Sequence, residues 1–199
     1  MIAYMRDVTV FILAIVVLLA PALPAQSVRG DTAAGKLLFQ NLKCAACHSV
    51  NGVGGKSAPA LGGPAYTPNK MAASMWSHVS TMWKAMDREG IQRPQLTERQ
   101  AADLYAFFAG GYNPDKPGDA KLGGKIYEAK LCASCHDAEE TGVPRLAGRA
   151  GEFSPFSLVA SLLRHGRGML SRMVSKDLQW QQLSADEMGD LIAYLNAKK

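Results

Sequence analysis

The pentapeptide Cys-x-x-Cys-His occurs twice and contains every cysteine of this 199-residue chain. The two copies are Cys44-Ala-Ala-Cys47-His48 and Cys132-Ala-Ser-Cys135-His136. Paired cysteines can also form a disulfide framework, a thioredoxin-like redox site or a zinc site. A zinc site built from both pairs would not need a histidine directly after each pair. The repeated spacing is instead that of the sequence to which c-type haem is attached.

The order of residues in the motif follows from the chemistry of attachment. Two thiols add to the two vinyl groups of the porphyrin, and the next residue supplies an imidazole as the proximal iron ligand. We therefore expect His48 and His136 to be proximal ligands and the chain to carry two covalent haem c groups. This interpretation uses all four cysteines, so it leaves no disulfide, no catalytic thiol and no cysteine axial ligand.

The segments around the motifs repeat as well, which indicates an internal duplication. The second motif follows the first at an offset of 88 residues, and 96–108 (LTERQAADLYAFF) corresponds to 183–195 (LSADEMGDLIAYL) at an offset of 87. Such similar offsets are typical of two copies of one domain that differ by short loop insertions. We expect a first domain at 26–112, a linker at 113–118 and a second domain at 119–199, held close by the short, proline-containing linker.

Each copy is predicted to be helical, so the expected fold class is all-α. Asp31 is placed to cap a helix that leads to the first motif. The last helix of each copy begins with a pair of residues at capping-box spacing. The pair is Thr97 with Gln100 in the first copy and Ser184 with Glu187 in the second. Glycine- and proline-rich stretches at 49–66 and 137–155 are predicted loops, and no run has the alternation of a strand.

The N-terminus predicts export. Residues 8–20 (VTVFILAIVVLLA) carry no charge, follow Arg6, and precede a proline- and alanine-rich end. A charged start, a short apolar stretch and small residues are typical of a secretory signal, which we place at 1–25. An uncleaved anchor is the alternative, although a spanning helix needs about 20 apolar residues. The expected location is the periplasm or another exported compartment.

Together these features resemble the class I c-type cytochromes, duplicated into a diheme protein. The resemblance covers essentially the whole chain after the signal, and it rests on the two motifs, the terminal helices and a glycine and an aromatic residue before each motif. In that family the first and last helices cross beside the motif, and aromatic residues pack at the crossing. The matching pairs are Phe39 with Phe107 and Tyr127 with Tyr194.

The resemblance also assigns a role to the proline that follows each haem loop. Pro59 and Pro144 would each offer a backbone carbonyl to the proximal histidine, which fixes the orientation of the ring and its basicity. A domain of about 80 residues is marginal without its cofactor. We therefore expect neither half to fold stably without haem.

The resemblance further implies a methionine as the distal ligand, before the last helix of each domain. Three pairs of matching residues are candidates, in this order of preference: Met86 and Met173, Met82 and Met169, His78 and His165. Ligation by two histidines would lower the haem potential, whereas histidine–methionine ligation raises it. The histidines could instead bond to the backbone or to a propionate.

Two further expectations concern the helix that carries these candidates. Met71 and Met75 share its face, but leucines stand at the matching positions of the second copy, so we expect both to be core residues. Gly166 and Gly168 weaken the corresponding helix of the second copy, and we expect Met173 to lie on a loop there.

Charge suggests the kind of partner. The net charge is +5, so we expect a protein donor and acceptor with acidic docking surfaces. A local basic run is Arg164, Arg167, Arg172 and Lys176, which could equally be a solvated face or bind propionates. No nucleic-acid motif is present, and no aromatic residues interleave with the basic run. Membrane contact is expected only through an uncleaved N-terminus or a membrane-bound partner.

Three functions remain open at this point. The first is a non-enzymatic electron carrier in a respiratory or oxidative chain. The second is a diheme redox enzyme, a peroxidase or a sulfur-compound oxidase, which would need an open iron position and acid–base groups. The third is the cytochrome subunit of a membrane-bound dehydrogenase or oxidase complex. We favour the first, because only His78 and His165 remain unassigned for catalysis.

Overall fold

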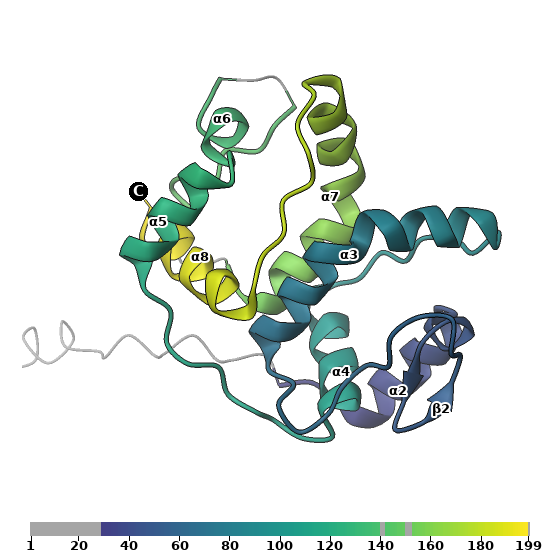
Figure 1. Ribbon diagram of the computed structural model, residues 1–199. Coiled ribbons are helices and arrows are strands. Elements are labelled where there is room, and N and C mark those ends of the chain that lie inside the picture. Colours follow the sequence, from purple (N-terminus) through teal and green to yellow (C-terminus); the bar gives the residue numbers. More distant parts are fainter. Residues whose placement is uncertain (1–28, 140–141, 150–152, 199) are drawn as a thin grey trace, which may run out of the picture.

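The computed structural model describes residues 29–139, 142–149 and 153–198, which are mostly helical (Figure 1). The first half contains α2 (Thr32–Asn41), the 3-10 helix η2 (Cys44–Ala46), the strands β1 (Ser49–Val50) and β2 (Val53–Gly54), α3 (Pro68–Arg88) and α4 (Glu98–Ala109). The second half contains α5 (Ala120–Ala129), α6 (Ala133–His136), α7 (Pro155–Ser175) and α8 (Ala185–Ala197). The all-α prediction is confirmed, with one small addition: β1 and β2 form an antiparallel hairpin inside the predicted loop 49–66.

Helices α2 and α4 cross at a glycine beside the first motif. A β-carbon on Gly35 would lie 1.9 Å from the backbone oxygen of Asp103, so only glycine permits this approach. The rings of Phe39 and Phe107 pack at the crossing with centroids 5.5 Å apart. Asp31 caps α2, and its N–H donates to the Asp103 carboxylate over 2.7 Å. The predicted cap and aromatic pair are both confirmed.

The second half repeats this crossing with α5 and α8. A β-carbon on Gly123 would lie 2.0 Å from the backbone oxygen of Asp190. The rings of Tyr127 and Tyr194 have centroids 5.2 Å apart, and the Asp119 N–H donates to the Asp190 carboxylate over 2.7 Å. The duplication seen in the sequence is therefore also a duplication of contacts.

Both terminal helices begin with the predicted capping boxes, which satisfy backbone N–H groups that would otherwise lack partners. The long helices α3 and α7 begin in a related way. Thr67 caps α3 and Ser154 caps α7, and a proline follows at the first helical position of each, where its missing N–H costs nothing.

Helix α7 continues without a break to Ser175, so the expectation that Met173 lies on a loop is wrong. The glycines that suggested a break have a packing role at one position. A β-carbon on Gly166 would lie 2.9 Å from the Trp83 ring of α3. Close packing at this crossing offsets the helix propensity lost at a glycine, which is about 1 kcal/mol.

The two halves join through their long helices. Helix α3 packs on α7 and on α8 of the other half, and α7 packs on α4 in the same way (Figure 1). The Ser77 hydroxyl donates to the Leu183 carbonyl over 3.1 Å, and the Arg164 guanidinium donates to the Leu96 carbonyl over 3.4 Å. Ser77 and Arg164 occupy matching positions of the repeat, and so do Leu96 and Leu183. Each half therefore makes the same contact to the other, as expected for two halves related by an approximate two-fold axis. Arg164, from the predicted basic run, is thus an interdomain contact.

A pair of tryptophans reinforces one side of this interface. The rings of Trp76 and Trp180 have centroids 5.1 Å apart. The Trp180 indole N–H donates to the Trp76 carbonyl over 2.7 Å, and the Trp76 indole N–H donates to the Gln181 carbonyl over 2.9 Å. Both tryptophans are half-buried, so each contributes apolar contact through its ring and a hydrogen bond through its N–H.

The predicted linker is also held in place. The Asp115 carboxylate accepts from the Asn69 N–H over 2.9 Å. The Tyr105 hydroxyl donates to the Asn113 carbonyl over 3.0 Å and accepts from the Asn113 N–H at the same distance. These bonds anchor the segment on the first half.

Replacing Ser77 with alanine should weaken the interface measurably. Its hydroxyl donates to the Leu183 carbonyl and accepts from the Leu183 N–H, both over 3.1 Å. Removing it leaves two part-buried backbone groups unpartnered, and we expect the free energy of unfolding to fall by about 1–2 kcal/mol in urea titrations. Ser161→Ala, at an exposed serine of α7, is the control and should change it by less than about 0.5 kcal/mol. Equal effects of the two substitutions would contradict the assignment.

The predicted signal, 1–25, lies outside the described residues. Among the residues that are described, no helix combines the length and apolarity needed to span a bilayer.

Candidate haem sites

The first motif forms a tight turn directly after α2. Lys43 has a left-handed backbone, with φ of 61°, and the η2 turn that follows begins at Cys44 and is capped by Cys47. Neither cysteine is in a disulfide. Burial raises the pKa of the Cys44 thiol to about 11, because the charged form is poorly solvated there. Both thiols are thus placed on one segment, as attachment to a single ligand requires.

The imidazole of the first motif is buried and oriented. His48 is only 8% exposed. Its Nδ1 lies 2.8 Å from the Pro59 carbonyl oxygen, which can only accept, so Nδ1 carries the hydrogen. The other ring nitrogen, Nε2, is then the one with a lone pair for a metal.

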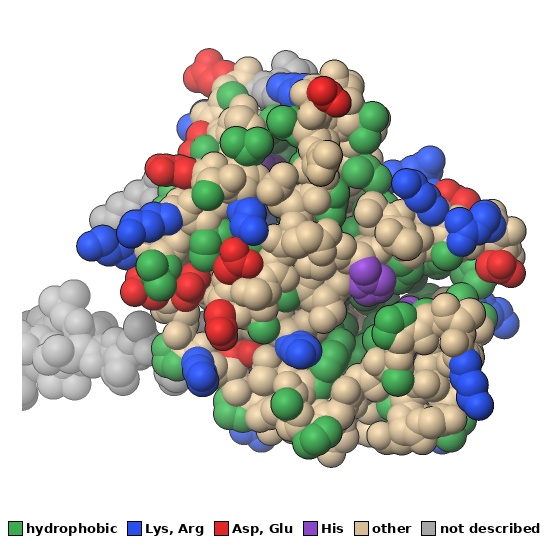
Figure 2. Space-filling model, in the orientation of Figure 1, with side chains coloured by type: hydrophobic (Ala, Val, Ile, Leu, Met, Phe, Trp, Pro, Cys, Tyr) green, Lys and Arg blue, Asp and Glu red, His purple; other side chains and the backbone are tan. Residues whose placement is uncertain are grey.

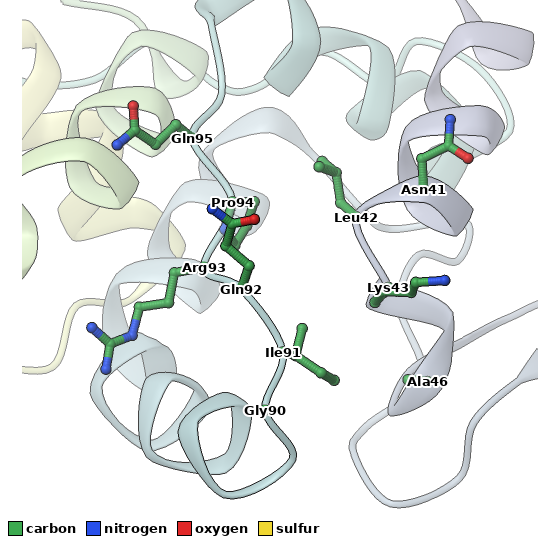
Figure 3. Close-up of a pocket in the computed structure, with 10 residues that line it drawn as sticks. All are labelled: Asn41, Leu42, Lys43, Ala46, Gly90, Ile91, Gln92, Arg93, Pro94 and Gln95. Atoms are coloured by element: carbon green, nitrogen blue, oxygen red, sulfur yellow. The ribbon is translucent and has the colours of Figure 1, made fainter.

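A cavity of about 760 Å³ opens beside this motif. One wall consists of residues 41–43 and Ala46, between the two cysteines, and the other is the segment 90–95 that precedes α4 (Figure 3). Leu42 and Ile91 line the gap from opposite sides, whereas the Arg93 side chain points away from it (Figure 3). Its volume is in the range of cofactor pockets, but none of Cys44, Cys47 and His48 lines it.

The second motif has the same imidazole geometry in a more open setting. The helix α6 ends at His136, whose Nδ1 lies 2.9 Å from the Pro144 carbonyl oxygen. Burial raises the pKa of the Cys132 thiol to about 11, as for its counterpart. His136 is partly exposed, however, whereas His48 is buried.

Next to the second motif lies a polar cluster with no equivalent in the first. The Asp137 carboxylate accepts from the Tyr127 hydroxyl over 2.9 Å and pairs with the Lys198 ammonium over 2.8 Å. The Lys198 ammonium also lies 4.6 Å from the Tyr127 ring centroid. This cluster ties the residue after the proximal histidine to the last helix, so it stiffens the motif.

The candidate distal ligands differ in how close they lie to the proximal histidine. In the first half His78 lies opposite His48, with ring centroids 6.2 Å apart. Met82 and Met86 lie further along α3 and are half-buried. Met71 is buried in the core, as expected.

In the second half the corresponding arrangement differs. His165 is exposed, and among the described residues no ring contact joins it to His136. Met169 and Met173 are half-buried on α7. The two halves therefore share the proximal geometry but not the distal one.

These donors fit covalent haem, because each half has two thiols on one turn and an imidazole oriented by a proline carbonyl. The family model for cytochrome c matches residues 32–110 and again residues 120–199. The chain belongs to the cytochrome c family. It consists of two tandem cytochrome c domains, here domain 1 and domain 2, and these imply two covalent haem c groups with iron. No curated protein and no solved structure matched the chain in the other two comparisons.

Haem-based electron transfer is the chemistry that the cytochrome c domains imply. The bound group supplies an iron that cycles between ferrous and ferric states. The chain's own contribution is to exclude water around His48, to hold the Nδ1 hydrogen on a carbonyl in both domains, and to keep the domains in fixed contact. A rigid ligand environment keeps the reorganisation small when the charge changes.

Proposed function

We propose that the chain is an exported diheme cytochrome c that carries electrons between two protein partners in a respiratory or oxidative chain. The observation that supports it most is the matched geometry of the motifs. In both domains the histidine after the cysteines donates from Nδ1 to a proline carbonyl, at 2.8 Å for His48 and 2.9 Å for His136. Two proximal rings with the same hydrogen bond, in domains that pack on each other, suit relay or storage of two electrons.

The proposed site residues follow from the motifs. The thioether residues are Cys44, Cys47, Cys132 and Cys135, the proximal ligands are His48 and His136, and Pro59 and Pro144 orient those ligands. For domain 2 we propose Met173 as the distal ligand, with Met169 and then His165 as the alternatives.

Export and partner choice are proposed from sequence and charge. The apolar stretch 8–20 after Arg6 supports a signal peptide, and the net charge of +5 supports partners with acidic docking surfaces. Basic and acidic side chains are interspersed on the face seen in Figure 2, so no single basic patch dominates there. We propose membrane contact only through an uncleaved N-terminus or a membrane-bound partner.

Electron exchange with proteins tests this function. The reduced holoprotein is mixed with an acidic redox protein in stopped flow. We expect two electrons to leave each chain, and the second-order rate to fall about tenfold or more between low salt and ~0.5 M salt, because screening removes electrostatic steering. A basic redox protein is the control, and its rate should not fall.

The same holoprotein distinguishes a carrier from a diheme enzyme. With excess peroxide, or with a reduced sulfur compound, we expect no turnover beyond the electrons stored on the two haems. Many turnovers per chain would contradict the carrier function and support an enzyme with an open iron position.

A further inference from the structure

We propose that His78 is the distal ligand of the iron in domain 1, so that this haem is held between two histidines. The inference rests on the proposed function, since it assumes that domain 1 binds haem at its motif. It departs from the order suggested by the sequence, which placed Met86 first. Four observations support it.

The first is the separation of the two imidazoles. Their centroids lie 6.2 Å apart, with an interplanar angle of 72°. A metal–imidazole nitrogen bond is about 2 Å long, and a ring centre lies about 1 Å behind its nitrogen. Two imidazoles bound to opposite sides of one metal should therefore have centroids about 6 Å apart. His48 and His78 are at that separation.

The second observation is the hydrogen bonding of both rings. The Nδ1 of His78 bonds to the Ser74 carbonyl oxygen, one turn earlier on α3. The Nδ1 of His48 bonds to the Pro59 carbonyl oxygen. Because carbonyls only accept, both rings are in the tautomer that leaves Nε2 unprotonated. Metal-binding histidines typically donate their other N–H to such a group.

The third observation is the position of the methionines on α3. A helix rises 1.5 Å per residue, so Met86 lies about 12 Å and Met82 about 6 Å further along the axis than His78. Met82 and Met86 lie one and two turns beyond His78 on α3, whereas the His78 ring lies beside the His48 ring. This spacing favours His78 over both methionines as the partner of His48.

The fourth observation is that domain 2 lacks this arrangement. His165 occupies the matching position but is exposed. Among the described residues it makes no ring contact and no side-chain hydrogen bond that would orient it as His78 is oriented. Hence the proposal covers domain 1 alone, and it makes the two haems inequivalent. Two histidines lower a haem potential relative to histidine–methionine, so the haem of domain 1 should be the lower-potential one.

Ferric spectra of the full holoprotein test the assignment. In His78→Ala we expect one of the two haems to change from low to high spin, and added imidazole to restore the low-spin spectrum. In His78→Met we expect the methionine–iron(III) band in the far red to gain one haem equivalent, and one midpoint potential to rise. Met86→Leu and His165→Ala are the matched controls, and neither should alter the spin state or ligand band of domain 1.

Retention of two low-spin haems in His78→Ala, or loss of one haem equivalent of the far-red band in Met86→Leu, would overturn the proposal. A ferric EPR spectrum of the unmodified protein gives a measurement that needs no variant. Two imidazoles near 72° should produce a strongly anisotropic low-spin signal from one haem, and its absence would also count against His78. Intact mass distinguishes failure of this inference from failure of the proposed function. If the unmodified chain carries no haem in domain 1, the proposed function is overturned as well. If it carries two haems but the ligand tests are negative, only this inference is overturned.

Discussion

A chain in which Cys44 and Cys47 are both replaced by alanine should carry one haem instead of two. Both thiols lie on the η2 turn, and no other cysteine of domain 1 can replace them. We also expect domain 1 to lose much of its helical signal, because a domain of about 80 residues buries too little surface to fold well without its cofactor. The pyridine haemochrome assay and intact mass measure the haem content, and far-UV circular dichroism measures the helix content.

Two comparisons make this result specific. Ala46→Ser changes the same turn to the residue that domain 2 has at the matching position, Ser134, and should keep both haems. Replacing Cys132 and Cys135 with alanine should remove the other haem. Two haems on the Cys44→Ala/Cys47→Ala chain would contradict attachment at the first motif.

Gly35→Ala should be among the most damaging single substitutions outside the motifs. The new β-carbon would lie 1.9 Å from the backbone oxygen of Asp103, so α2 and α4 would have to separate at the crossing that carries the Phe39–Phe107 pair. Overpacking usually costs about 1–3 kcal/mol, and a clash with backbone cannot be relieved by rotating a side chain. We expect a loss of about 3 kcal/mol or more in the free energy of unfolding, measured by urea titration of the holoprotein.

Gly168→Ala is the matched control, since it is also a glycine inside a helix. Nothing lies within 4 Å of its β-carbon position. Only helix propensity changes there, so the free energy of unfolding should stay constant or rise by up to about 1 kcal/mol. If both variants lost stability equally, the close approach at Gly35 would not explain its effect.

Local patterns were sufficient for the architecture. The capping residues Asp31, Thr97 and Ser184 mark helix starts because they act within one turn of chain. The duplication predicted that each crossing would occur twice, and Gly35 and Gly123 meet their partner helices in the same way. The break expected at Gly166 was wrong, because a ring from another helix packs there and outweighs the local preference.

The sequence was enough to predict haem attachment at the motifs and two tandem domains, because covalent attachment depends on residues that are neighbours in the chain. It ranked Met86 above His78 only through the family resemblance, since both recur in the second copy and both lie on the same side of the helix. Which side chain stands level with His48 depends on how α3 crosses the rest of the molecule. That crossing is set by packing against α7 and α8 of the other domain, over contacts about 100 residues apart in sequence, and so it appears only when the whole chain is folded.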